Sequence, residues 1–420
     1  MRLQGSQLRY IKKVQDALRE YDNELQTINR RIWNNPEVAY TEHQAHDHIC
    51  ALFEALDSSY TVRRHAYGIA TAFEIEYQHG GKGNCRVLAF NAEYDALPGI
   101  GHACGHNLIA TSSIAAFIGT CEAMKAVAPD GLSCTVRLLG TPAEESGGGK
   151  IRLLDNGAYT DVDACLMIHP TPMDPARPDL LGLATAPEGG FLANDKVRVM
   201  FTGKPAHAAA APWEGINALD AVVAAYVNIS LLRQQILPSQ RVHGVIVNGG
   251  DRPNIIPWSA SVDYYIRSPT IATLKPLTER VVKCFEAAAI ATGCTVDFEW
   301  GPSYADVKTN TPICKSYVSV MRAMDHHVLF TVPPGETGGA STDMGNVSYV
   351  IPGFHGIFTI PAEGGNHTPQ FTVGAGSLEA YKRAIDCAAG MAVVACHFFE
   401  DDEFAREVKE DFLRGSVIDR

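Results

Sequence analysis

The sequence lacks the long apolar run that a membrane-spanning helix needs. Its apolar stretches are broken by glycine, asparagine or charged residues well short of the roughly 18 residues that cross a bilayer. Residues 1–6 contain no apolar segment of the kind that secretory signals carry, and no internal repeat or low-complexity tract is visible. We therefore expect a soluble cytoplasmic protein without a membrane partner.

An excess of positive charge and a disulfide framework are missing as well. The 35 Lys and Arg residues are outnumbered by 47 Asp and Glu residues, and the formal net charge is −12. A chain with this charge is not expected to bind nucleic acid. The 11 cysteines lack framework spacing, and several of them, such as Cys121 and Cys165, lie within apolar patterns. We expect reduced thiols in the core of a protein from a reducing compartment.

The chain of 420 residues contains alternating strands and helices in its N-terminal half. Three near-continuous apolar runs, at 87–90, 134–139 and 164–168, are separated by helical segments. Such runs are typical of strands that are buried on both faces of a parallel sheet. The predicted fold class is α/β, with a mixed, mainly parallel sheet and helices on both faces.

Two helices are predicted before this sheet. Apolar residues at helical spacing over 6–33 indicate one amphipathic helix. Thr41 begins the second helix, with Gln44 at the position that a capping box requires. We interpret three histidines of the second helix as part of its solvent-facing polar side: His43, His46 and His48.

The pattern changes near residue 187, where 186–190 indicate a hinge. The order β-α-β-β-α-β over the next stretch, about 110 residues, is typical of a ferredoxin-like α+β domain. We therefore predict that 189–303 form a domain inserted into a larger one, which consists of 1–188 and 304–420. A closing helix is predicted at about 377–398.

Side chains that bind metals gather at the predicted carboxyl ends of the strands. The turn 101–107 carries His102, Cys104 and His106, the next strand ends at Glu144 and Glu145, and the third ends at His169. In open α/β sheets ligands bind at this edge, and thiolate, imidazole and carboxylate groups suit zinc and related metals. By itself the turn is also explained by a buried cysteine and two surface histidines, but successive strand ends favour a metal site.

A pair of metal ions about 3.5–4 Å apart requires a shared ligand, terminal ligands and an open position for water. Cys104 or a carboxylate can bridge the two ions, and Asp95 can orient a ligand imidazole from behind. In the Glu pair, one carboxylate can bind metal while its neighbour acts as general base on the activated water. Terminal ligands are available in His106, His169, His367 and one glutamate.

The chain resembles the metal-dependent aminoacylase and carboxypeptidase family, which includes hippurate hydrolase, carnosinase and the auxin-conjugate amidohydrolases. Within that family the continuous stretch 93–107 is most similar to the cytosolic dipeptidases that cleave β-alanyl-lysine and Xaa-Arg type peptides. The likeness covers nearly the whole length and rests on seven ordered motifs: Asp95-Ala96-Leu97-Pro98, His102-Ala103-Cys104-Gly105-His106, Pro142-Ala143-Glu144-Glu145, Ile168-His169, Gly203-Lys204-Pro205-Ala206-His207-Ala208, Asn254-Ile255-Ile256-Pro257 and His367-Thr368.

The resemblance implies a zinc-peptidase-like catalytic domain that holds two divalent metal ions per subunit, with zinc expected and manganese or cobalt as alternatives. It implies Glu144 as the general base and Asp95 as a residue behind the site. His102 lies outside the ligand pattern of the family. The implied ligands are Cys104 as the bridge, with His106, Glu145, His169 and His367.

For the inserted domain, the resemblance implies a lid that also forms a homodimer. His207 would reach the active site of the partner subunit and help to stabilise the oxyanion, and Asn254 would contribute to substrate binding. Arg267 is a candidate for binding the substrate carboxylate, because guanidinium groups bind carboxylates through two hydrogen bonds. An interface or a structural ion pair is the alternative role for Arg267.

We predict metal-dependent hydrolysis of an amide or peptide bond in a dipeptide or N-acyl amino acid. The expected mechanism uses a metal-activated water and the Glu144 base. Two alternatives remain open. The same site could belong to a specialised biosynthetic deacylase or an amide-forming enzyme, or the chain could be a non-catalytic binding protein that retains the fold.

Overall fold

The computed structural model describes residues 5–81, 85–186, 190–331 and 339–418. They form two compact units, which we call the sheet unit (Met1–Glu188, Val307–Gly338 and Asn346–Arg420) and the inserted unit (Gly189–Asp306 and Gly339–Gly345). Residues 339–345 thus belong to the inserted unit, although the sequence analysis placed them in the larger domain. The predicted hinge includes residues 187–189, which lie outside the described part.

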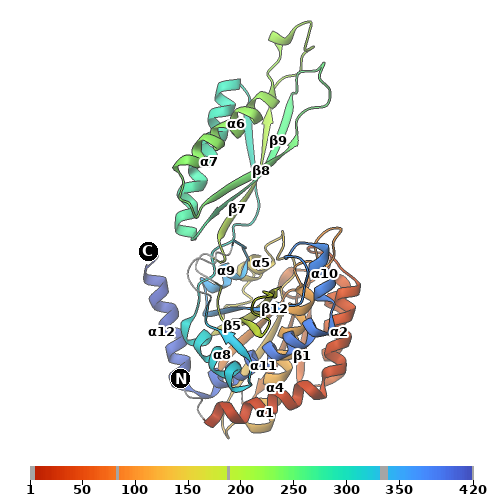
Figure 1. Cartoon of the computed structure of the whole chain (residues 1–420), viewed down its shortest axis with the longest axis vertical. Helices are drawn as coiled ribbons and strands as arrows, with labels where there is room; N and C mark the ends of the chain where they lie inside the picture. Colours follow the sequence, from red (N-terminus) through yellow and green to blue (C-terminus); the bar gives the residue numbers. More distant parts are fainter. Residues whose placement is uncertain (1–4, 82–84, 187–189, 332–338, 419–420) are drawn as a thin grey trace. The chain divides into compact units, whose positions relative to one another are not determined.

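The sheet unit is built on an eight-stranded sheet with the order β1-β2-β4-β3-β5-β12-β6-β11 (Figure 1). Its central neighbours β4, β3, β5 and β12 run parallel, whereas β1, β2 and the β12–β6 pair are antiparallel. The prediction of a mixed, mainly parallel sheet is confirmed. The strands are β1 Tyr60–Arg64, β2 Phe73–His79, β3 Arg86–Ala92, β4 Cys134–Gly140, β5 Ala164–Pro172, β6 Leu180–Leu183, β11 His327–Leu329 and β12 Gly353–Ile360.

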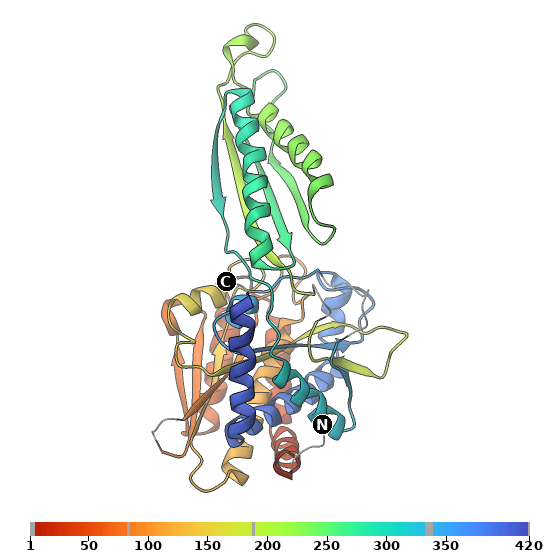
Figure 2. The ribbon, with the colours of Figure 1, turned by 90° about the vertical axis from the view of Figure 1, so that its left-hand side faces the viewer.

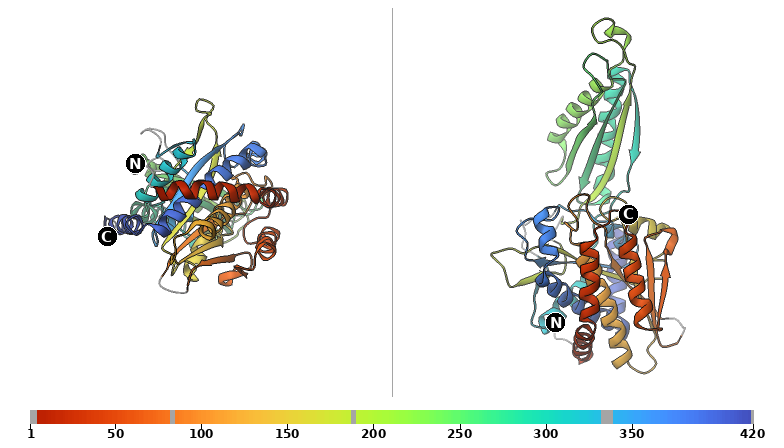
Figure 3. Two further views of the ribbon diagram at one scale, coloured as in Figure 1. Left: turned by 90° about the horizontal axis from the view of Figure 1, so that it is seen from below. Right: turned by 90° about the vertical axis from the view of Figure 1, so that its right-hand side faces the viewer.

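Helix α4 (His106–Val127) packs against β3, β4 and β5, and its residues are almost all buried because α1 and α11 cover its other sides. Figure 3 (left) shows α1 running across this end of the unit. The predicted closing helix is α11, and α12 after it was not predicted. The helices of this unit are α1 Gly5–Glu20, α2 Asp22–Asn34, α3 His43–Leu56, α4, α5 Gly149–Asp155, α8 Thr311–Ala323, α10 Pro369–Ala375, α11 Leu378–Glu400 and α12 Asp402–Ile418; α9 Met344–Ser348 spans the boundary of the two units.

The N-terminal helices differ from the prediction in two ways. The single helix expected over 6–33 is broken at Tyr21, and the Tyr381 hydroxyl lies within hydrogen-bond distance of the Asp22 carbonyl and carboxylate oxygens at the break. Apolar periodicity continues through the break, so the pattern could not reveal it. Helix α3 begins after Glu42 rather than Thr41, and the Glu37 carboxylate accepts hydrogen bonds from the amides of its first turn.

The interpretation of the α3 histidines was wrong for His46, which is fully buried. Its ring stacks on His65 with 4.6 Å between the centroids, and its Nδ1 lies 2.9 Å from Asp47 Oδ1. A helical pattern cannot distinguish this inward position from a polar surface position, because burial here depends on a loop that is distant in sequence.

The inserted unit is a four-stranded antiparallel sheet with the order β10-β7-β9-β8. Figure 2 shows α6 and α7 in front of its strands, and their apolar sides form one core with the sheet around Phe201, Tyr264 and Phe285. The element order matches the predicted β-α-β-β-α-β pattern. The elements are β7 Ala193–Thr202, α6 Ala218–Leu232, β8 Arg241–Asn248, β9 Ser259–Ser268, α7 Ile271–Thr292 and β10 Thr295–Trp300.

No helix of the described residues is both long and apolar enough to cross a bilayer.

Candidate metal centre

Parallel strands bring the predicted ligands to one edge of the sheet. Because β3, β4 and β5 run in the same direction, the segments that leave β3 and β4 emerge beside the carboxyl end of β5. These segments carry Asp95 after β3 and the pair Glu144 and Glu145 after β4, while His169 lies within β5 itself. The turn that carries Cys104 and His106 leads directly into α4.

The five predicted ligands lie together in two groups of three. Cys104, His106 and His169 form one group, and Cys104, Glu145 and His367 form the other, with the ligand atoms of each group within 4.8 Å of one another. Cys104 is common to both groups, as a bridging ligand has to be. The Cys104 Sγ atom lies 3.3 Å from His169 Nε2, and His367 Nε2 lies 3.5 Å from Glu145 Oε1.

Two of these ligand atoms fit a cation for an additional reason. The His106 Nε2 and Glu145 Oε1 atoms are buried and lack a hydrogen-bond partner within the described residues. Buried polar atoms rarely stay unsatisfied, because each costs about 1–3 kcal/mol. A metal ion bound in each group would satisfy the atom that belongs to that group, His106 Nε2 in the first and Glu145 Oε1 in the second.

Backbone conformation holds the ligands in these positions. Gly105 has a φ of +80°, and a Cβ atom there would lie 2.5 Å from Pro170 Cγ, so only glycine fits between Cys104 and His106. His367 also adopts a left-handed conformation, with a φ of +67°. This conformation costs about 1–2 kcal/mol in a residue other than glycine. The His367 amide donates a 2.8 Å hydrogen bond to the Ala103 carbonyl, which ties His367 to the turn.

Hydrogen bonds at the second ring nitrogen orient two of the imidazoles. The Nδ1 atom of His106 lies 3.0 Å from Asp95 Oδ1, and the Nδ1 atom of His169 donates to the Pro170 carbonyl at 2.8 Å. Both rings therefore present Nε2 to the ligand groups. The other Asp95 oxygen accepts a 3.0 Å hydrogen bond from the Glu145 amide, so Asp95 links both ligands from behind.

Burial and neighbouring charges set the protonation of the metal-free centre. Burial lowers the pKa of His169 to about 4 and raises the pKa of the Cys104 thiol. Burial acts to raise the pKa of Asp95, but the charge and hydrogen bond of His106, the hydrogen bond from the Glu145 amide and the charge of Lys150 together lower this pKa. His169 is thus already neutral, as a metal ligand must be, whereas Cys104 would lose its proton on binding metal.

Glu144 lies beside the same groups, with its Oε2 atom 3.9 Å from His106 Nε2 and only 6% of its surface exposed. The residue before it, Ala143, has a φ of +60°, and the Ala143 amide donates a 2.9 Å hydrogen bond to Glu42 Oε1. Glu42 is fully buried and supports the turn that carries the two glutamates. The sequence analysis did not assign Glu42 a role.

Glu93 is the second residue that the sequence analysis left unassigned. It forms a third group of close ligand atoms with His106 and Glu144. The available signal was its position two residues before Asp95 in an extended segment, since alternate residues of such a segment point to the same side. His102 lies outside all three groups, and its Nε2 atom is 3.0 Å from the Ile32 carbonyl oxygen.

The remaining predicted site residues belong to the inserted unit. His207 is exposed, and its Nδ1 accepts hydrogen bonds from the amides of Ala209 and Ala210 at 3.3 and 3.1 Å, so its Nε2 carries the proton. The Ala208 amide donates to the Asn254 carbonyl at 3.1 Å, which places Asn254 beside the His207 loop.

Arg267, on β9, donates from Nη1 to the Gly339 carbonyl at 3.1 Å and to Ser341 Oγ at 2.9 Å. Within the described residues it forms no ion pair with a carboxylate, and burial lowers the pKa of its guanidinium. The structural ion pair that the sequence left open for Arg267 is therefore not found in the described part of the chain.

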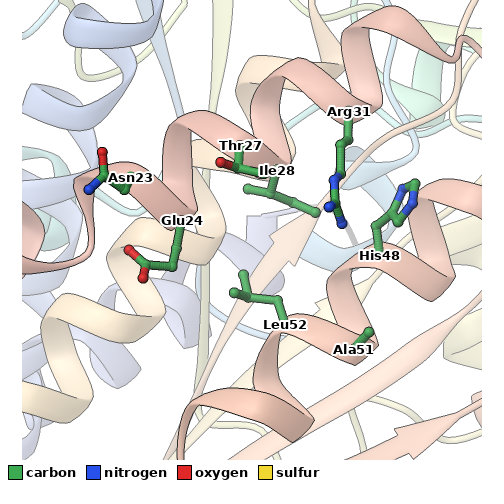
Figure 4. A pocket seen from close by; sticks show the side chains of 8 residues that line it. All are labelled: Asn23, Glu24, Thr27, Ile28, Arg31, His48, Ala51 and Leu52. Carbon is green, nitrogen blue, oxygen red and sulfur yellow. The ribbon is translucent and has the colours of Figure 1, made fainter.

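A separate hollow of about 280 Å³ lies between α2 and α3, and Figure 4 shows Arg31 and His48 together at one end of it. It contains one histidine and no cysteine, so it lacks the ligand set of the metal groups. Its lining residues are Asn23, Glu24, Thr27, Ile28, Arg31, His48, Ala51 and Leu52.

Comparison with known sequences identifies relatives over most of the chain. A model described as Peptidase family M20/M25/M40 matches residues 89–392. The Xaa-Arg dipeptidase of Mus musculus is 40% identical over 410 residues, which cover 96% of this chain and 91% of the relative. The N-acetyl-L-cysteine deacetylase of Bacillus subtilis (strain 168) is 27% identical over 317 residues, covering 68% of this chain and 70% of the relative.

Solved structures share the fold at low sequence identity. A dinuclear metal-binding peptidase of the M20 family from Bacillus subtilis has a TM-score of 0.64 at 20% identity, covering 90% of this chain and 99% of that one. An aminobenzoyl-glutamate utilization protein from Klebsiella pneumoniae has a TM-score of 0.67 at 18% identity, with coverages of 90% and 98%. At these identities the comparison establishes the fold.

Proposed function

The chain belongs to peptidase family M20/M25/M40, and we propose that within this family it is a dipeptidase that cleaves peptides with a basic C-terminal residue. Its activity is metal-dependent hydrolysis of a peptide or amide bond in a small substrate. The observation that carries the narrower assignment is the identity with the mouse Xaa-Arg dipeptidase, which extends over 96% of this chain. Arginine, lysine and ornithine are the C-terminal residues to test.

The metal that we propose is zinc, with two ions per subunit. Cys104 would be shared, His106 and His169 would hold one ion, and Glu145 and His367 would hold the other. Thiolate and imidazole favour zinc among the common divalent metals, although manganese and cobalt also bind such sites. When bound, zinc polarises the scissile carbonyl and lowers the pKa of water to about 7.

Glu144 is the general base in this proposal. Its carboxylate lies beside the ligand groups and 3.9 Å from His106 Nε2, in reach of a water between the ligands and the substrate carbonyl. It would take a proton from the water during attack and pass it to the leaving amine nitrogen. Asp95 keeps the His106 ring fixed while this proton moves, through the 3.0 Å contact to Nδ1.

The inserted unit would supply the groups that bind substrate. Arg267 is the proposed partner of the substrate carboxylate, because no carboxylate of the described chain is paired with it. Asn254 is proposed to contact the substrate as well. The protonated Nε2 of His207 is a ready hydrogen-bond donor for an oxyanion, and we propose that it acts in the partner subunit of a homodimer.

A dimer through the inserted unit is supported by its exposed apolar surface. Strand β8 lies at one edge of the four-stranded sheet, and its residue Val245 is 62% exposed. An apolar edge strand is prone to pair with another chain. The exposed apolar residues of β8 and α6 are Val245, Ile246, Val247, Val223, Tyr226, Val227 and Leu231.

A cytoplasmic location is also part of the proposal. The 11 cysteines of the chain are all unpaired. Free thiols in this number are typical of a reducing compartment.

The test is hydrolysis of a mixed substrate panel, followed by mass spectrometry. The panel contains β-alanyl and α-aminoacyl dipeptides that end in Arg, Lys or Orn, beside N-acetyl and N-benzoyl amino acids, with added Zn²⁺ or Mn²⁺ and again with chelator. We expect chelator-sensitive cleavage of the dipeptides with basic C-termini. Cleavage of the N-acyl amino acids alone would contradict the dipeptidase assignment and favour a deacylase. Binding without cleavage by metal-loaded protein would favour the non-catalytic alternative.

A further inference from the structure

Glu93 and Lys150 form an ion pair that is completely buried beside the ligand groups. Both side chains are at most 1% exposed, and Lys150 Nζ lies 2.5 Å from Glu93 Oε1. Lys150 comes from the first turn of α5, whereas Glu93 follows β3. Burying two charges is costly, and a buried pair is often no more stabilising than apolar residues of the same size. Stability alone therefore does not account for this buried ion pair.

The second oxygen of Glu93 faces the metal ligands. Glu93 Oε2 lies 3.5 Å from His106 Nε2, the ring nitrogen that is left for metal because Asp95 holds Nδ1. Both Glu93 Oε2 and His106 Nε2 are buried without a hydrogen-bond partner in the described residues. A cation in reach of both atoms would satisfy the two at once, and the carboxylate of Glu144, the proposed base, lies close to both atoms.

The charges of the centre explain why a lysine lies here. With two divalent ions bound, the centre contains five anionic groups, one more than the ions neutralise: the Cys104 thiolate and the carboxylates of Glu93, Asp95, Glu144 and Glu145. Lys150 supplies the missing positive charge through Glu93. It neutralises one carboxylate oxygen and leaves the other oriented toward His106.

We propose that Glu93 is a further metal-facing donor on the His106 side of the centre, and that Lys150 is the positioning residue that holds it there. This inference rests on the proposed two-metal site. It assigns a role to two residues that lie outside the five ligands and the base.

The experiment measures metal binding by the full chain rather than activity. Metal-free wild-type protein, Glu93→Gln, Lys150→Met and the double variant are titrated with Zn²⁺ in competition with a chromophoric chelator. Glu93→Gln should bind one of the two ions about 10–100-fold more weakly, the usual loss when a supporting group of a metal site is removed. The double variant should show the same loss without leaving a buried charge unpaired.

Lys150→Met and Glu93→Gln should change the zinc-induced rise in Tm in opposite directions. Without Lys150 the Glu93 charge stays uncompensated until a cation binds. The rise in Tm on adding Zn²⁺ should therefore be larger than in the wild type, whereas in Glu93→Gln it should be smaller. An unchanged rise in Lys150→Met would contradict the role of Lys150.

Glu74→Gln is the matched control. Glu74 is a buried carboxylate of the same unit that pairs with Arg63 and Arg137, and it belongs to none of the ligand groups. It should lose stability but keep wild-type zinc affinity. Two ions bound with wild-type affinity by both Glu93→Gln and the double variant would overturn the inference while the proposed function stands. A wild-type protein that binds no metal would instead refute the proposed function itself.

Discussion

The two units hold their polar groups in opposite ways. In the sheet unit, His106 and Asp95 are buried, and each is fixed by hydrogen bonds from another side chain or from the backbone. In the inserted unit, His207 is exposed, and among the described residues its ring is held only by two backbone amides of its own loop. Arg267 is likewise held by a carbonyl and a hydroxyl, with no carboxylate partner in the described residues.

The difference shows that the sheet unit fixes the arrangement of its polar groups by itself, whereas the inserted unit does not. Buried polar atoms must be satisfied inside the protein, because each unsatisfied one costs about 1–3 kcal/mol. The ligand groups therefore have one arrangement, which a cation completes. His207 is exposed, so water can satisfy its ring until substrate or another subunit replaces that water. Arg267 is partly buried, and a backbone carbonyl and a hydroxyl group accept hydrogen bonds from its guanidinium in place of a carboxylate. Variants in the two units should thus fail in different ways.

The largest effect is expected for Glu144→Ala. This variant should keep its metal and fold but lose about 10²–10⁴-fold in kcat, because it removes the proton acceptor and no ligand. Turnover of the preferred dipeptide and metal content by mass spectrometry are the measurements. Glu145→Ala is the control, and it should lose metal as well as activity. Near-normal turnover of Glu144→Ala would refute its assignment as base.

His207→Ala should lower kcat by about 10²–10³-fold with unchanged metal content, since it removes one oxyanion donor and leaves the ligands intact. Mixing it with Glu144→Ala protein should restore part of the activity through hybrid dimers. Each hybrid contains one site with an intact base and an intact partner histidine. No recovery after subunit exchange has been confirmed would contradict action across the dimer.

Arg267→Met should act mainly on substrate binding. Losing a charged hydrogen-bond donor is worth about 1.5–3 kcal/mol, so KM should rise about 10–100-fold while kcat changes less. Arg198→Met is the matched control, because Arg198 pairs with Asp263 on the exposed surface of the same unit. Equal effects of the two substitutions on KM would mean that Arg267 has no special contact with substrate.

The smallest effect concerns the stability of metal-free protein. Burial raises the pKa of Glu42 from 4.5 to about 7. Between these values the folded state keeps a proton that the unfolded state has lost, so stability should fall as pH rises through this window. Glu42→Gln should remove that part of the fall, about 1–3 kcal/mol. Tm measured from pH 4.5 to 7 for both proteins checks this, and parallel curves would show that Glu42 titrates normally.

Much of the fold could be predicted because runs of apolar residues in the sequence indicate which strands are buried. The apolar runs of β3, β4 and β5 indicated strands buried in a parallel sheet, and that arrangement implies a shared edge at which ligands gather. The break between α1 and α2 and the burial of His46 could not be predicted. Both depend on partners far away in the chain, Tyr381 and His65.

The sequence by itself determined which residue types reach the edge of the sheet and in which order. Only the tertiary structure decided that the His367 amide is tied to Ala103 and that Lys150 holds Glu93 beside His106. Periodicity and short motifs follow from contacts within a few residues. Convergence of side chains from separate strands and loops depends on strand order, register and packing, which no short stretch of sequence encodes alone.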